Sequence, residues 1–226
     1  MALWYLIHGA ASSRLIWTRQ MPILRGAKRA ELPILDDVPE VRLINAWADW
    51  CLEQLTQPAV IMGHSMGGAI AQTMALKAPE LVEGLVLVGT GPHLPVNPAL
   101  IQSLLDTPRE ALERITRWSL AKNPDPDLLQ KSLEQARSVD THEAWRQFVA
   151  CTAFDVRSDL RRITCPKAII AGAEDRMTPE SLTRSFLDAW PDAPYHQISG
   201  AGHSMMLEQP EIFNDILLDL MEKFNW

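Results

Sequence analysis

Residues 60–72 read VIMGHSMGGAIAQ, and this stretch decides how the chain is expected to fold. The apolar run at 58–63 is typical of a buried strand, and the pattern over 67–77 predicts a helix. Between them, GHSMG at 63–67 matches G-x-S-x-G. In a sharp strand-to-helix turn, bulky side chains two positions before or after the Ser would collide, and glycine removes those collisions. The turn would expose the Ser65 hydroxyl above a sheet, although a purely structural glycine turn would carry the same letters.

The rest of the chain alternates short apolar runs with helical patterns. Continuously apolar strands are typical of a parallel sheet covered on both faces. The strands expected are 3–9, 58–63, 84–89, 167–172 and 195–199, with a weaker edge strand at 31–35 that contains Pro33. The helices expected around them are 15–25, 45–55 with Asn45 as its cap, 67–77, 179–190 and 210–224. The sequence therefore predicts an α/β fold with a mostly parallel sheet of about six strands flanked by helices.

The alternation breaks between the strands at 84–89 and 167–172. The intervening segments all read as helices that begin near Pro, Asp or Thr, and they are residues 98–106, 108–122, 126–137 and 141–154. We expect residues 1–92 and 156–226 to form the core and residues 93–155 to form a helical lid insertion.

Composition narrows the class of protein. The 226 residues suffice for one domain with an insertion, and 47% of them are hydrophobic. A net charge of −7 argues against binding to nucleic acid or an anionic membrane, which needs a basic face. Three scattered cysteines favour a reduced, cytoplasmic compartment. No run is long enough for a membrane span, and no His spacing suits a zinc site, so we expect no metal and no cofactor.

A Ser nucleophile needs a His base that follows it in the chain, with an Asp or Glu in between. His203 lies in a glycine-flanked loop after the strand at 195–199, and Asp175 lies in the loop after the strand at 167–172. Loops at the carboxyl ends of strands are where α/β folds assemble their sites. The order Ser65, Asp175, His203 fits, and the adjacent Glu174 is the alternative acid.

An oxyanion also needs donors. The Met66 N–H follows the Ser, and the small residues of the loop after the first strand let a backbone N–H approach a substrate. We expect Ala10 to supply it, with Ala11 as the second choice, and His8 to order the loop.

For several other side chains we expect a structural role rather than a chemical one. Trp118 and Trp145 are expected in the core, with a substrate pocket as the alternative. Glu208 is expected to serve the start of the last helix. The arginines of the insertion are expected on a solvated helix face, and they are Arg109, Arg114, Arg117, Arg137 and Arg146.

Four stretches resemble, in order, the α/β-hydrolase superfamily and its lid-bearing serine esterase-like branch: LIHGAASSRLIW, VIMGHSMGGAIAQTMALKAPELVEGLVLVGT, FDVRSDLRRITCPKAIIAGAEDRMTP and ISGAGHSMMLEQPEIFNDIL. The resemblance implies Ser65 as nucleophile, His203 as base, Asp175 as its orienting acid, and the Ala10 and Met66 amides as the oxyanion hole. Members usually begin with an extra antiparallel strand pair, which is lacking here, and carry D-x-x-G-x-G-x-S where this chain has LPILDDVPEVRLINAW.

The resemblance implies a carboxylesterase that cleaves esters of small substrates through an acyl-enzyme intermediate. Ser at the turn disfavours dehalogenase and epoxide hydrolase chemistry, in which relatives place an Asp. Thioesterase, C–C bond hydrolase, perhydrolase or cofactor-free haloperoxidase, and acyltransferase chemistry remain alternatives, because they differ in the shape of lid and pocket. A non-catalytic small-ligand receptor is the alternative from another class. The sequence sets neither the acyl specificity nor the oligomeric state.

Overall fold

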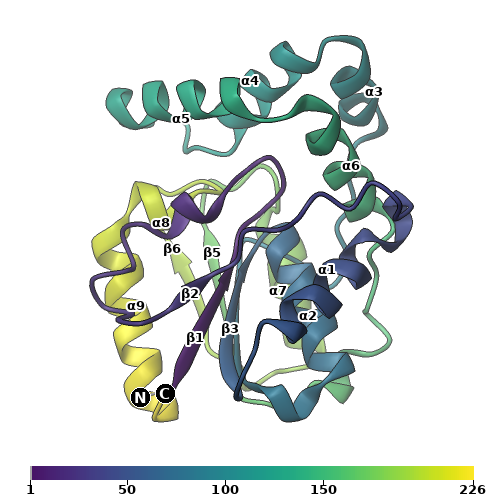
Figure 1. Ribbon diagram of the computed structural model, residues 1–226. Helices are drawn as coiled ribbons and strands as arrows, with labels where there is room; N and C mark the ends of the chain where they lie inside the picture. Colours follow the sequence, from purple (N-terminus) through teal and green to yellow (C-terminus); the bar gives the residue numbers. More distant parts are fainter. Residues whose placement is uncertain (1) are drawn as a thin grey trace.

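The computed structural model describes residues 2–226 and has the expected α/β architecture (Figure 1). Within the described residues the sheet has six strands, all parallel, in the order β2-β1-β3-β4-β5-β6. Their bounds are β1 Leu3–Ile7, β2 Lys28–Arg29, β3 Ala59–His64, β4 Val82–Val88, β5 Lys167–Gly172 and β6 Tyr195–Ile198. The prediction of about six strands is confirmed, and the sheet is parallel throughout.

Helices cover both faces of this sheet (Figure 1). On one face, α1 (Leu43–Glu53), α2 (Met66–Lys77) and α7 (Glu180–Arg184) pack against the strands in a core that contains Trp47, Ile70 and Phe186. On the other face, α8 (Met205–Glu208) and α9 (Pro210–Phe224) enclose a second core with Trp17, Phe213 and Leu217. Because both faces are buried, the central strands are apolar at nearly every position.

Four helices form an insertion between β4 and β5: α3 (Pro98–Asp106), α4 (Pro108–Trp118), α5 (Pro126–Ser138) and α6 (Thr141–Thr152). Their starts confirm the helix signals in the sequence, because Asn97, Asp125 and Asp140 each accept a backbone N–H at the first turn. Helices α3, α4 and α6 share a small core around Leu104, Leu112 and Phe148. Figure 1 shows α3, α4 and α5 lying across the carboxyl ends of the strands.

Several local predictions were wrong near the first two strands. Residues 31–35 form no strand, and the edge strand is the two-residue β2 just before them. Pro33 has no N–H for a ladder, and its carbonyl instead accepts a hydrogen bond from Trp47 Nε1. The helix expected at 15–25 is a single 3-10 turn, Arg14–Trp17, followed by irregular turns.

Two helix boundaries also differ from expectation. The helix expected to begin at Asn45 begins at Leu43, because a 3-10 turn at Glu40–Arg42 leads directly into it, so Asn45 caps nothing. The helix expected over 179–190 is the short α7 followed by a 3-10 turn at Ser185–Asp188. Among the described residues, each helix is too short or too polar to cross a lipid bilayer.

Arg146 was wrongly expected on a solvated face. It is only 2% exposed, and its guanidinium donates to the carbonyls of Leu35 and Val38 and pairs with Glu40 and Glu143. A buried cation requires such partners. Arg146 therefore fastens α6 of the insertion to the loop that precedes α1.

Candidate active site

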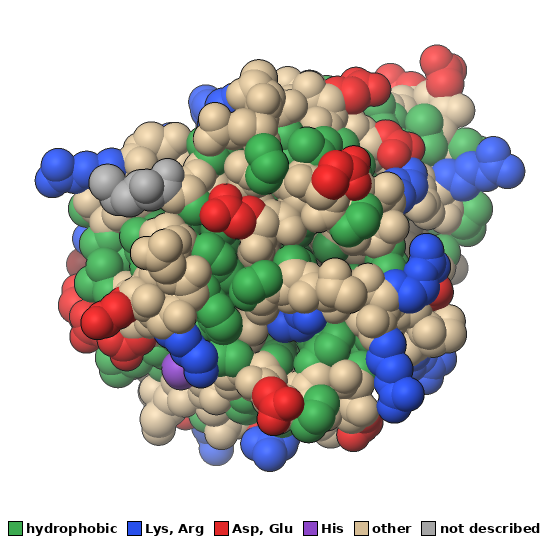
Figure 2. Space-filling model, turned by 90° about the horizontal axis from the view of Figure 1, so that it is seen from below, with side chains coloured by type: hydrophobic (Ala, Val, Ile, Leu, Met, Phe, Trp, Pro, Cys, Tyr) green, Lys and Arg blue, Asp and Glu red, His purple; other side chains and the backbone are tan. Residues whose placement is uncertain are grey.

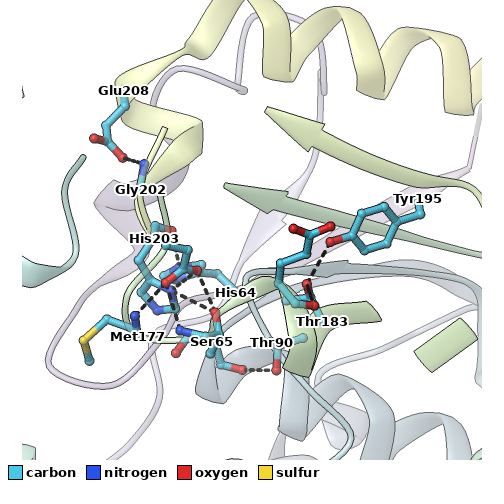
Figure 3. Close-up of polar contacts among 12 residues, drawn as sticks. His64, Ser65, Thr90, Met177, Thr183, Tyr195, Gly202, His203 and Glu208 are labelled. Atoms are coloured by element: carbon cyan, nitrogen blue, oxygen red, sulfur yellow. Dashed lines mark hydrogen bonds and ion pairs between the residues drawn. The ribbon is translucent and has the colours of Figure 1, made fainter. Parts of the chain in front are cut away.

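Ser65 occupies a strained turn between β3 and α2. Its φ of 54° and ψ of −120° are unusual for a residue with a side chain. A Cβ added at Gly63 would lie 2.2 Å from the Gly67 carbonyl oxygen, and one at Gly67 would lie 2.3 Å from that of Ile7. These contacts confirm why the turn needs glycine on both sides. The Ser65 carbonyl accepts a hydrogen bond from Thr90 Oγ1 at 2.9 Å, which helps to hold the turn (Figure 3).

His203 and Asp175 form a buried pair beside this turn. His203 Nδ1 lies 2.8 Å from Asp175 Oδ2, and the two residues are 5% and 6% exposed. His203 and the half-buried Ser65 line the same pocket. The alternative acid is elsewhere: the exposed Glu174 accepts a hydrogen bond from the Lys122 N–H. The structure thus brings Ser65, Asp175 and His203 together and leaves Glu174 aside.

The two oxygens of Asp175 have different partners. Oδ1 accepts the backbone N–H groups of Met177 and Thr178, which makes a local turn. Oδ2 accepts the Thr178 hydroxyl at 2.7 Å as well as facing His203. Burial opposes the ionisation of Asp175, but the charge of His203 and the hydrogen bonds from His203 and Thr178 outweigh it and lower its pKa. Asp175 is therefore ionised, and it forms the turn with one oxygen and faces His203 with the other.

Thr178 escaped the sequence analysis. Its hydroxyl also lies 3.2 Å from His203 Nδ1, so it contacts both members of the pair. The signal in the sequence is Thr three residues after Asp, the spacing at which an Asp side chain closes a turn.

His64, immediately before Ser65, contacts both the ring and the backbone of His203. The two imidazole rings are 4.5 Å apart, and His64 Nε2 lies 3.0 Å from the His203 carbonyl oxygen (Figure 3). Burial holds the pKa of His64 well below its usual range, so the ring is neutral and its Nε2–H can donate to that carbonyl. His64 therefore fixes the backbone of the His203 loop.

The loop after β1 lies against the Ser65 turn. The Ala11 N–H is taken, because it donates to Gln147 Oε1 of α6 at 2.8 Å. Ala11 has a φ of 51°, so this bond holds a backbone conformation that Ala seldom adopts. Ala10 lines the pocket beside Ser65, and Met66 is the first residue of α2, where N–H groups have no intrahelical acceptor. Gln147 is a second residue that the sequence analysis missed.

Two pockets meet at Ser65, with volumes of about 100 Å³ and 260 Å³. Ala10, Ser65, Phe148 and Met177 line both. Trp118 lines the larger pocket and is 39% exposed, so the expectation that it belongs to the core was wrong. Trp145 packs in the core of the insertion, as expected.

Glu208 was wrongly expected to serve the start of the last helix. Gln209 precedes α9, and the Glu208 carboxylate accepts the N–H group of Gly202 (Figure 3) and that of Ala121. Burial raises its pKa. Glu208 thus ties the His203 loop to the segment between α4 and α5, where Ser204 N–H also donates to the Ser119 carbonyl.

The face of the molecule away from the insertion carries both positive and negative side chains. Figure 2 shows Lys and Arg side chains interspersed with Asp and Glu on the face away from the insertion, an arrangement typical of a solvated surface. Among the described residues, three or more His, Cys, Asp or Glu side chains nowhere group as metal ligands.

The geometry places a serine in a strained strand-to-helix turn beside a buried His–Asp pair, at the carboxyl ends of a parallel sheet. The model of the alpha/beta hydrolase family matches residues 5–216. The chain belongs to the α/β-hydrolase family.

Known proteins of this family resemble the chain closely in fold. A thermophilic esterase superimposes with a TM-score of 0.84 at 27% identity, over 99% of this chain and 91% of that chain. An esterase from Exiguobacterium antarcticum gives a TM-score of 0.87 at 18% identity, over 98% and 92%, and shows the fold alone. A pimeloyl-[acyl-carrier protein] methyl ester esterase from Chromobacterium violaceum is 27% identical over 194 residues, 79% of this chain and 76% of that protein.

Proposed function

We propose that this α/β-hydrolase is a serine esterase that cleaves carboxylic esters through an acyl-enzyme intermediate. One observation carries the proposal: His203, whose Nδ1 lies 2.8 Å from the buried Asp175 carboxylate, shares a pocket with Ser65 on its strained turn. Two relatives at 27% identity are named esterases, one of them for a methyl ester, which favours an ester over other acyl substrates.

In the first half of the reaction, Ser65 Oγ attacks the acyl carbon while His203 Nε2 takes its proton. Asp175 keeps the His203 proton on Nδ1, so that Nε2 is free to act as base, and stabilises the imidazolium that forms. The oxyanion of the tetrahedral intermediate binds the Ala10 and Met66 N–H groups. The bond to the alcohol oxygen then breaks, and His203 returns its proton to that oxygen.

In the second half, water attacks the acyl-enzyme, and His203 again takes the proton. Collapse of the second intermediate breaks the bond to Ser65 Oγ, which recovers the proton, and the carboxylic acid leaves. Residues 93–155 act as a lid that covers the reacting atoms, because α4, α5 and α6 contribute Ile115, Ala136 and Phe148 to the pocket walls. This lid excludes bulk water, which strengthens the hydrogen bonds to the oxyanion.

A ligand receptor would need neither a strained Ser65 nor a buried carboxylate against His203. The backbone strain at Ser65 costs stability, of the order of 1–3 kcal/mol, and such strain clusters at functional sites. The arrangement therefore favours turnover over binding alone.

The test compares adjacent acids. Asp175→Asn should lower kcat for a p-nitrophenyl ester by about 10⁴-fold, because the amide favours the wrong tautomer of His203. Glu174→Gln is the matched control and should leave kcat close to native, since Glu174 contacts Lys122 instead. Near-native turnover in Asp175→Asn, with the fold intact by circular dichroism, would contradict the proposed triad.

A further inference from the structure

The two pockets at Ser65 differ in which catalytic side chain they contain. The pocket of about 100 Å³ includes His203, His64 and Ser204 and runs between the His203 loop and helices α4 and α5. The pocket of about 260 Å³ does not include His203 and runs below α3, along Leu94, Val96 and Leu182. A carbonyl carbon held at Ser65 and Ala10, which line both, would therefore send one substituent into each.

Proton transfer decides which substituent goes where. When the tetrahedral intermediate collapses, the alcohol oxygen must take its proton from His203, so the alcohol lies on the side of His203. We infer that the smaller pocket holds the alcohol of the ester and the larger pocket holds its acyl chain. This inference rests on the proposed esterase function and deepens it by naming the substrate class.

The shape and polarity of each pocket define that class. An apolar cavity of about 150 Å³ holds benzene, which lies between the two volumes. The alcohol pocket is smaller than this, and its lining includes Thr116, Ser119 and Ser132, of which Thr116 and Ser119 donate their hydroxyl groups to backbone carbonyls of α4. The acyl pocket is larger and is walled mainly by apolar side chains, with Trp118 at one side and the polar side chains Asn97 and Arg176 also in its lining. The substrates are esters of a compact alcohol, such as methanol or ethanol, with an apolar acid of medium chain length or an aryl acid.

Phe148 and Met177 separate the two pockets, because they line both. Phe148 comes from α6 of the insertion, and Met177 follows Asp175 in the core. Apart from the four shared residues, each lining residue belongs to one pocket, so the two specificities should respond to substitutions independently. That independence is the property an experiment can measure.

The experiment uses two ester series and two matched variants of the full chain. One series is the methyl esters of acetic, butanoic, hexanoic and octanoic acid; the other is the methyl, ethyl, butyl and benzyl esters of butanoic acid. Val96→Trp fills the acyl pocket and Ser132→Trp fills the alcohol pocket, and both residues are half-buried. Hydrolysis is followed by acid release, and kcat/KM is compared within each series.

For the native protein we expect methyl octanoate to exceed methyl acetate, and methyl butanoate to exceed benzyl butanoate, each by about tenfold or more. Val96→Trp should remove the first preference and leave the second within twofold. Ser132→Trp should steepen the discrimination against larger alcohols and leave the acyl preference within twofold. Val96→Phe and Ser132→Leu carry the same test if a Trp variant does not fold.

Exchanged responses, with Val96→Trp acting on the alcohol series, would overturn the assignment of the pockets. Equal effects of both variants on both series, or no effect of either, would overturn the separation of the pockets. In each of these cases ester hydrolysis persists and the proposed function stands. A folded native protein that hydrolyses no ester in either series instead contradicts the proposed function itself.

Discussion

The hydrogen bond between Gln147 and Ala11 offers a direct test of whether the insertion positions the loop after β1, in which the Ala10 N–H is the proposed oxyanion donor. Gln147→Met keeps the length of the side chain but removes the acceptor for the Ala11 N–H. Leaving the Ala11 N–H without this acceptor costs about 1–3 kcal/mol, whereas the strain at its φ of 51° is present in the native protein and the variant alike. The equilibrium between the native and a relaxed conformation of the loop would therefore shift by about 1–3 kcal/mol, and the ratio of the two would fall about 5- to 160-fold.

The assay is kcat and KM on a p-nitrophenyl ester. We expect Gln147→Met to lower kcat by about 5- to 160-fold and to leave KM nearly unchanged, because in the proposed mechanism the Ala10 N–H acts on the developing oxyanion. Adding Ala11→Gly should restore part of kcat, since glycine adopts a positive φ without strain. Glu143→Gln is the control: it alters the other partner of Gln147 and keeps the bond to Ala11. A kcat within threefold of native in Gln147→Met, or an equal loss in Glu143→Gln, would refute the reasoning.

Three further outcomes follow from the contacts around the site. Ser65→Gly should raise the free energy of unfolding by about 1 kcal/mol, because relief of backbone strain exceeds the entropy cost of glycine, whereas Ser65→Ala should leave it unchanged. In thermal melts the melting temperature of Ser65→Gly should therefore exceed that of Ser65→Ala by about 2–4 °C. Equal melting temperatures would show that the backbone at Ser65 is not strained. Thr178→Val should lower kcat about tenfold, as expected for the loss of a hydrogen bond to a carboxylate. Because the folded pKa of Asp175 is depressed, its contribution to stability is present above its ordinary pKa and is lost as the pH falls through the lowered value. In Thr178→Val that contribution should be smaller and its loss should be complete at a higher pH, and an unshifted acid limb in the pH profiles of stability and kcat would contradict the role of Thr178. Glu208→Gln should lower the free energy of unfolding by about 1–3 kcal/mol, since one of the two N–H groups that now donate to the carboxylate loses its acceptor. Denaturant melts measure this free energy. An unchanged midpoint would show that Glu208 does not hold the His203 loop to the segment between α4 and α5.

The sequence predicted those parts of the fold that local patterns determine. The buried strands β3, β4 and β5 are continuous apolar runs, and the four helices of the insertion begin at Pro and at capping side chains. Residues 15–25 failed as a helix although they carry apolar residues, because Ile16 and Trp17 are buried under α8 and α9 by tertiary packing. The two-residue β2 is too short for any periodicity to reveal.

The candidate site likewise contains residues that local patterns predicted and residues that they did not. Ser65, Asp175 and His203 were found because each follows a recognisable strand in the order that a strand-by-strand fold requires. Gln147 was invisible because its partner Ala11 is 136 residues away. Arg146 was misplaced for a related reason: a loop distant in sequence folds over it and supplies the carbonyl groups that satisfy its charge. Contacts between distant segments leave no periodic mark in one sequence.

The most direct test of the central claim is the site at which a fluorophosphonate attaches. The reagent phosphonylates a serine that an adjacent base activates, and peptide mass spectrometry locates the adduct. The account predicts one adduct on the peptide that contains Ser65, slower labelling of Asp175→Asn, and neither labelling nor ester hydrolysis in Ser65→Ala. An adduct on another residue, or ester hydrolysis that persists in Ser65→Ala, would contradict Ser65 as the nucleophile.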